Sequence, residues 1–302
     1  MTRVLPYQLT DNLFVLGHNL FLTYLVKGKP CALIDLGVSG TVPLISHQLK
    51  QIGVEAGDIG YLVVQHAHWD HVCGLPYLMQ LSPKAVVVGS TKARDILGKP
   101  KIVGQFRQND EFYCSTLKEK QVFVELPTFI QYDTLPIDQV VKDGETISLG
   151  NVELNFLDTP GHSPCSISVY LPSEKAVLIS DALGAYLPQS DTFLPVFYQN
   201  AEMMLDSLEK IKKLDVNIVG YGHDVNMVTI GKEKISHSYN RTREEIVKLT
   251  TEIRQMAASG TAEEILLDKL YRACFKGFLA EIYSPEFIKS LSPFLLKAIT
   301  RG

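Results

Sequence analysis

The segment VVQHAHWDHVCGLP, Val63–Pro76, places three histidines and one aspartate within six residues: His66, His68, Asp70 and His71. This polar run directly follows the apolar residues YLVVQ, which are typical of a buried strand. Burying so many polar groups without partners would cost several kcal/mol of folding free energy. The segment therefore predicts a strand whose end leads into a site where these side chains bind something.

Three more predicted strands end in the same residue types. His162 follows FLDTPG, Asp181 follows VLIS and His223 follows IVGYG, so five of the eight histidines of the chain fall at such points. Loops at strand ends are where α/β proteins build their sites. Neutral imidazole and carboxylate oxygens are good ligands for zinc, iron and manganese. Five histidines and two aspartates are enough for two metal ions with about three ligands each and a bridge.

The other histidines and two further strand-end aspartates receive ordinary roles. We interpret His18, His47 and His237 as polar groups with common hydrogen-bond partners, and Asp35 and Asp158 as turn or capping residues. Cys73 and Cys165 lie near the predicted ligands in sequence, and we interpret them as small packing residues.

Composition narrows the class of protein. The chain has 302 residues, 46% of them hydrophobic, and a net charge of −4. It contains no basic block of the kind that binds nucleic acid. Its five cysteines are scattered, odd in number and outside CxxC pairs, which favours reduced thiols in a cytoplasmic protein.

No segment near the start predicts a membrane span or a signal peptide. The most apolar early segment, residues 13–26, is interrupted by Gly17, His18 and Asn19, which predicts two strands and a tight turn. It is too short to cross a bilayer. We therefore expect a cytoplasmic protein that acts on a small molecule, with neither nucleic acid nor membrane as a partner.

The pattern of the chain changes near residue 235. Strands and helices are predicted to alternate over residues 1–235, with helices and then a loop over 91–137. Residues 236–302 carry helical patterns only, which predicts a tail of about three helices. Within it, Ser284-Pro285 and Ser292-Pro293 each predict a helix start with proline at the first position.

The motifs HAHWDH, GHS, SDA and GH together resemble the metallo-β-lactamase superfamily, over about residues 10–230. The resemblance implies an α/β fold, a four-layer αββα sandwich, here with a C-terminal helical extension. It also implies two metal ions at the edge between the sheets, zinc first, with iron and manganese as alternatives.

The resemblance also implies a role for each predicted ligand. His66, His68 and His162 would hold the first metal, and Asp70, His71 and His223 the second. Asp181 would bridge them, as in glyoxalase II and in lactonases, whereas true β-lactamases lack this aspartate. Asp70 and Asp181 are the candidate catalytic residues.

The expected activity is hydrolysis of a small thioester or ester by a metal-bridging hydroxide. HWDHVCGLPYL, SDALG and the helical tail resemble the quinolone-signal response thioesterases of the superfamily. Three alternatives stay open: a lactonase or phosphodiesterase, an iron-dependent redox enzyme, and a metal-bearing regulatory protein that acts through a partner. The flavodiiron pattern has a glutamate where His68 stands, which disfavours that redox branch.

The tail and two tyrosines could complete a substrate pocket. The apolar stripes of the tail could pack on the core, roof the metals as an acyl-binding slot, or form a homodimer contact. Since every predicted ligand lies at or before His223, we expect the metals not to need the tail. Tyr186 and Tyr221 lie near Asp181 and His223 in sequence and could donate to a substrate oxygen, although packing is their ordinary role.

Overall fold

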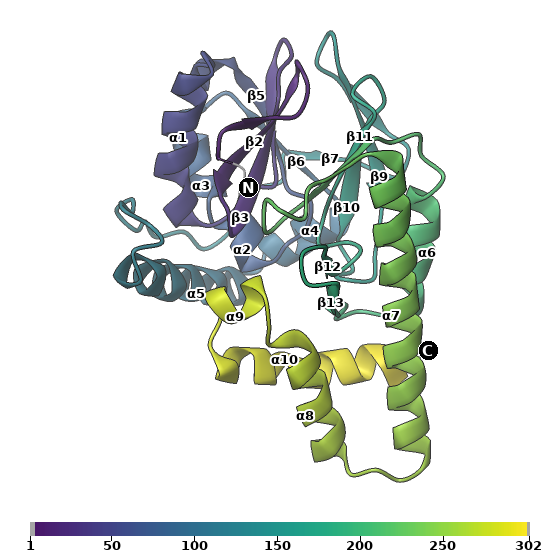
Figure 1. Cartoon of the computed structure of the whole chain (residues 1–302). Coiled ribbons are helices and arrows are strands. Elements are labelled where there is room, and N and C mark those ends of the chain that lie inside the picture. Colours follow the sequence, from purple (N-terminus) through teal and green to yellow (C-terminus); the bar gives the residue numbers. More distant parts are fainter. Residues whose placement is uncertain (1–3, 301–302) are drawn as a thin grey trace.

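The computed structural model describes residues 4–300 and contains two β-sheets packed face to face, with helices on both outer faces (Figure 1). The first sheet has seven strands in the order β1-β2-β3-β4-β5-β6-β7. Their bounds are β1 Tyr7–Gln8, β2 Leu13–His18, β3 Phe21–Val26, β4 Cys31–Ile34, β5 Ile59–Val63, β6 Val86–Gly89 and β7 Gln139–Val140.

The second sheet has six strands in the order β15-β14-β11-β10-β9-β8, and β12 pairs with β13 in a separate ribbon. Their bounds are β8 Thr146–Ser148, β9 Glu153–Asp158, β10 Ile167–Leu171, β11 Ala176–Ser180, β12 Ala185–Leu187, β13 Thr192–Leu194, β14 Ile218–Tyr221 and β15 Thr229–Ile230. The hairpin predicted for residues 13–26 is present as β2 and β3, and β8 with β9 and β10 with β11 are also antiparallel pairs.

The helices divide between the two outer faces and the tail. The helices before the tail are η1 Ser39–Thr41, α1 Val42–Gln51, η2 Ala56–Asp58, α2 Trp69–Val72, α3 Leu75–Leu81, α4 Thr91–Leu97, α5 Pro100–Glu119 and α6 Ala201–Ile211. The tail contains α7 Lys232–Ala258, α8 Glu263–Cys274, α9 Phe278–Ile282 and α10 Pro285–Thr300.

Alternation along the strands explains the layers. In β4, Cys31 and Leu33 belong to the core shared with α1, α3 and α4, whereas Ala32 and Ile34 belong to the core between the sheets. In β11, alternate residues divide in the same way between the inter-sheet core and the core that α6 and α7 cover. Successive side chains of a strand point to opposite faces, so each sheet buries both of its faces. The expected four-layer αββα order is confirmed.

Strand direction brings the predicted site residues to one edge. β4 and β5 are parallel, as are β11 and β14. β9 and β11 flank β10, and both are antiparallel to it, so β9 and β11 also point the same way. The carboxyl ends of these strands, and the loops that follow them, therefore share one edge of each sheet.

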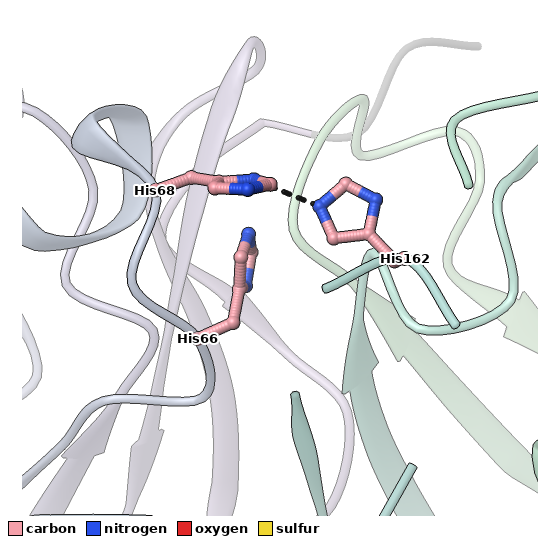
Figure 2. A group of neighbouring side chains, drawn as sticks. All are labelled: His66, His68 and His162. Atoms are coloured by element: carbon pink, nitrogen blue, oxygen red, sulfur yellow. Dashed lines mark hydrogen bonds between the residues drawn. The ribbon is translucent and has the colours of Figure 1, made fainter. Parts of the chain in front are cut away.

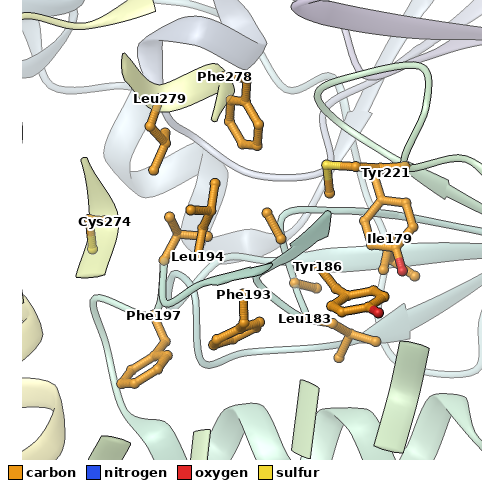
Figure 3. Close-up of a cluster of buried hydrophobic side chains, with 14 of the residues drawn as sticks. Ile179, Leu183, Tyr186, Phe193, Leu194, Phe197, Tyr221, Cys274, Phe278 and Leu279 are labelled. Atoms are coloured by element: carbon orange, nitrogen blue, oxygen red, sulfur yellow. The ribbon is translucent and has the colours of Figure 1, made fainter. Parts of the chain in front are cut away.

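The tail packs on the rest of the chain through an extensive apolar cluster. Figure 3 shows Cys274, Phe278 and Leu279 of the tail beside Leu194 and Phe197, which lie in β13 and in the segment after it. Up to residue 300, where the described part of the chain ends, the tail contains four helices, one more than expected, because α9 is a separate helix of five residues. The boundary at residue 235 stays a prediction. α7 begins at Lys232 and shares this cluster with α6.

One predicted helix start in the tail is wrong. Ser292-Pro293 lies inside α10, which runs unbroken from Pro285, the other predicted start. Proline inside a helix leaves the carbonyl four residues earlier without its partner. Here that residue is Lys289, and both Lys289 and Pro293 are exposed, so water can bind the free carbonyl. Among residues 4–300, no helix has the length and apolar character that crossing a membrane requires.

Candidate metal centre

All seven predicted ligands meet at the shared edge of the two sheets. His66 and His68 follow β5, Asp70 and His71 lie in α2, and Asp181 follows β11. His162 and His223 come from the loops after β9 and β14. The structure thus brings residues separated by up to 157 positions, His66 and His223, into one cluster, as the strand-end pattern predicted.

The first group consists of His66, His68 and His162, each of which offers one ring nitrogen within 4.8 Å of the other two (Figure 2). Nε2 of His162 lies 2.9 Å from Nδ1 of His68. The ring centroid of His66 is 4.7 Å from that of His68 and 4.8 Å from that of His162. Three imidazoles that converge in this way, two from the segment after β5 and one from the loop after β9, can bind one metal ion.

The second group consists of Asp70, His71 and His223, again within 4.8 Å. Nε2 of His71 and Nε2 of His223 are 3.1 Å apart. Oδ2 of Asp70 lies 3.6 Å from the first and 3.5 Å from the second.

Asp181 lies between the two groups. Its Oδ2 is 3.7 Å from Nε2 of His162 in the first group. The same oxygen is 3.4 Å from Nε2 of His71 and 3.6 Å from Nε2 of His223 in the second. A carboxylate that reaches both groups is placed as a bridge between two cations would be.

One buried nitrogen without a partner indicates whether this set of donor atoms suits metal ions. His66 is buried, and its Nε2 has no hydrogen-bond partner among the described residues. Leaving such an atom unpaired costs about 1–3 kcal/mol, which coordination to a cation would remove. Because imidazole and carboxylate are also the donors that divalent transition metals prefer, the residues fit two such ions.

Neighbouring groups fix the proton positions on three of the rings. Nδ1 of His162 donates to the carbonyl of Val196, and Nδ1 of His223 donates to the carbonyl of Leu20 at 2.6 Å. A carbonyl can only accept, so these rings carry their proton on Nδ1 and can present a lone pair on Nε2. Nδ1 of His71 lies 2.9 Å from Asp35, which orients the third ring in the same way.

Asp35 therefore corrects an interpretation made from the sequence. It is buried, and it accepts hydrogen bonds from His71 and, at 2.6 Å, from the Ser180 hydroxyl. Asp35 and Ser180 both have positive φ, 61° and 49°, a strained backbone typical of functional sites. In the sequence, an aspartate directly after a strand suggests a turn. That Asp35 also orients the ring of His71 is visible only in the structure, which brings the two residues together.

Burial and charge set the protonation of the cluster. Burial lowers the pKa of His66 and lowers that of His68 to about 3, so both imidazoles are neutral, as ligands must be. Burial also acts to lower the pKa of His223, but the charge of Asp181 and the hydrogen bonds to Asp181 and Asp70 together outweigh it and raise that pKa to about 10. The pKa of His71 is raised likewise by Asp35 and Asp70. Metal binding releases the protons that such imidazoles otherwise hold.

A cavity of about 460 Å³ opens onto the two groups. Asp70, Asp181 and three of the histidines form its polar end. Most of its walls come from α5 and from α9 and α10 of the tail, so the tail roofs the cluster; Trp69, Val196 and Tyr198 complete them.

The tyrosines at this cavity are not the two singled out from the sequence. Tyr186 donates to Asp191 and Tyr221 pairs with Ser238, and neither lines the cavity. Tyr198 and Tyr283 line it instead. No sequence pattern links these two residues to the histidine motif.

The comparisons agree with this geometry. The family model described as the metallo-beta-lactamase superfamily matches residues 22–223. A nitric oxide reductase of Moorella thermoacetica is 28% identical over 171 residues, which are 56% of this chain and 35% of that protein. A hydroxyacylglutathione hydrolase of Hyphomonas neptunium is 37% identical over 83 residues, 27% of this chain and 30% of that one. The matched part thus spans only about a third of each relative.

The fold itself is found in solved structures. A subclass B3 metallo-beta-lactamase isolated from a soil metagenome library superposes with a TM-score of 0.60 at 20% identity. The match covers 85% of this chain and 98% of the other. At this identity the likeness concerns the fold alone.

Proposed function

Because the chain belongs to the metallo-beta-lactamase superfamily, we propose that it is a dinuclear metal-dependent hydrolase of a small thioester or ester. The observation that carries the proposal is Asp181, whose Oδ2 lies between two three-residue donor groups. The similarity to a hydroxyacylglutathione hydrolase, a thioester hydrolase by name, supports the same class of bond.

In this proposal each donor group holds one ion. His66, His68 and His162 would hold the first, Asp70, His71 and His223 the second, and Asp181 would contact both. When bound, two divalent cations would lower the pKa of a shared water and polarise the carbonyl of the substrate.

The net reaction consumes one water. The water oxygen forms a bond to the acyl carbon, the acyl–sulfur bond breaks, and the products are a carboxylate, a thiol and one proton. The residues around the cavity support this reaction by excluding bulk water from the acyl group and by positioning it.

Two tyrosines contribute at the polar end of the cavity. Burial raises the pKa of Tyr198 and of Tyr283, so both keep their phenolic protons at neutral pH. The Tyr283 hydroxyl donates to Oδ2 of Asp70. Tyr198 lies with its ring centroid 5.6 Å from that of His162 and has its hydroxyl as a donor for a substrate oxygen.

An iron-dependent redox enzyme is the second candidate, because the Moorella relative is a nitric oxide reductase by name. The test is a panel assay on protein loaded separately with zinc, manganese or iron. We expect turnover of thioesters or esters and none of nitric oxide. Hydrolysis of lactones or phosphodiesters alone, redox turnover with iron alone, or no turnover with any metal would each overturn the proposal.

A further inference from the structure

The walls of the cavity differ sharply from its polar end. Outside the donor groups, the lining contributed by the described residues is aromatic and aliphatic, apart from the amides Gln105 and Asn109 of α5. It contains no lysine or arginine. A buried carboxylate or phosphate on the substrate would therefore find no countercharge along these walls.

Helices α5 and α10 form the far part of the cavity. Phe106 of α5 and Phe287, Leu291 and Phe294 of α10 line it, and the last three stand at one-turn intervals along the same face of α10. The spacing produces a continuous apolar strip that leads away from the polar end. Phe294, at the far end of the strip, is 56% exposed, so the cavity opens to solvent there.

We call the apolar far part of the cavity, lined by Phe106, Phe287, Leu291 and Phe294, the slot. The two halves of a thioester differ in how well they suit it. The biological carrier thiols bear amides together with carboxylates or phosphates, which need donors and cations. The slot offers apolar surface, and burying such surface is worth about 25 cal/mol per Å². The acyl half is the part of the substrate that can be wholly apolar.

We propose that this slot binds an uncharged, apolar acyl group of medium length and thereby selects such acyl thioesters over small or charged ones. The assignment rests on the proposed hydrolase function, because the polar end must receive the carbonyl. The acyl chain lies along α10 toward Phe294, and the thiol half lies outside the slot.

Trp69 supplies a binding assay that does not depend on turnover. It is the only tryptophan in the chain, it lines the cavity, and it stacks on Tyr113 with centroids 5.2 Å apart. Ligand in the slot will change the surroundings of the indole and hence its fluorescence. The probes are S-alkyl N-acetylcysteamine thioethers of increasing chain length, which cannot be hydrolysed, titrated into metal-loaded protein.

The variants are Leu291→Ala and Phe294→Ala, with Ile265→Ala as the matched control. Ile265 is an exposed apolar residue of the tail, 55% exposed, and it lies outside the cavity. Phe294 is equally exposed, so its loss should not disturb folding. We expect the affinity of wild type to rise with chain length. Each slot variant should weaken the octyl probe about tenfold or more while binding of the ethyl probe hardly changes.

Activity adds a second test with two substrate series. In one, the thiol is N-acetylcysteamine and the acyl group grows from acetyl to octanoyl. In the other, the acyl group is acetyl and the thiol varies. We expect kcat/KM to rise as the acyl group grows, and not to depend on the thiol in the same way. In the slot variants, the rise of kcat/KM with acyl length should be smaller.

The outcomes separate the two proposals. Equal kcat/KM for acetyl and octanoyl thioesters, a preference that follows the thiol series, or tighter binding of charged acyl groups would overturn the acyl slot alone. Length-dependent fluorescence binding without hydrolysis of any thioester would overturn the proposed activity and leave the apolar slot standing.

Discussion

The hydroxyl of Tyr283, in the tail, donates a hydrogen bond to Oδ2 of Asp70, a predicted metal ligand 213 positions earlier in the chain. Phe278, also in the tail, stacks on the ring of His223 with centroids 4.7 Å apart. The expectation that the metals do not need the tail came from ligand positions alone. These contacts argue against it, since groups that orient a ligand affect metal affinity.

Replacing Tyr283 with phenylalanine should weaken metal binding about 10–100-fold, because Asp70 loses the donor that orients it. Metal affinity is measured by competition with a chromogenic chelator, and the cobalt-substituted protein should show a changed visible spectrum. Tyr271→Phe is the control, because Tyr271 is also in the tail, in α8, but does not line the cavity. Identical affinity and spectrum in Tyr283→Phe and wild type would remove Tyr283 from the metal centre.

The fold and the ligand cluster could be predicted because both depend on local patterns. Alternating apolar residues mark the strands, and the polar residues stand directly after them. Because His162, Asp181 and His223 each follow a predicted strand, the sequence marked them as candidate ligands. The family resemblance then placed them beside the histidine motif, which follows a strand of the other sheet.

The roof of the site could not be predicted in the same way. An apolar stripe on a helix indicates that this face of the helix is buried, but it does not indicate which surface covers the face. Phe278 lies in α9 and Tyr283 directly after it, and their contacts with His223 and Asp70 span 55 and 213 positions of the chain. Asp35 was missed for a related reason: its sequence neighbours suit a turn, and its partner His71 comes from another strand end.

Replacing Asp181 with asparagine should lower kcat by at least about a hundredfold while the fold persists. An amide of the same size cannot supply the negative charge that two cations share. Elemental analysis should give about two metal ions per chain for wild type and fewer for the variant. Asp158→Asn is the matched control, since Asp158 also ends a strand but belongs to neither donor group. Unchanged turnover with both metals bound would exclude Asp181 as the bridge.

Replacing Gly222 with alanine should damage the centre without touching a ligand. A Cβ there would lie 2.6 Å from Cε1 of His71 and 3.0 Å from Oδ1 of Asp181, so the imidazole must shift. A misplacement of about 1 Å at a site can cost about a hundredfold in rate. Metal content and kcat/KM should both fall. The control is Gly104→Ala in α5, where a Cβ meets nothing within 4 Å. If Gly222→Ala binds metal and turns over like that control, the packing around His71 is looser than the structure indicates.

Replacing Asp110 with asparagine should stabilise the protein at neutral pH but not at acidic pH. Asp110 is 2% exposed, and burial raises its pKa to about 6 although the backbone N–H of Ser39 donates to its Oδ1 at 3.0 Å. The unfolded chain ionises this group near its ordinary value of 3.8. Wild type therefore has its full stability below about pH 4 and loses up to about 3 kcal/mol as the pH rises through about 6.

Asparagine keeps the acceptor for Ser39 and carries no charge. The stability of the variant relative to wild type should thus rise by about 2–3 kcal/mol between pH 4 and pH 7 and then stay level. Urea denaturation at a series of pH values measures this difference, with the exposed Asp95→Asn as control. A difference that is the same at pH 4 and pH 8 would show that Asp110 ionises in the folded protein as it does in the unfolded chain.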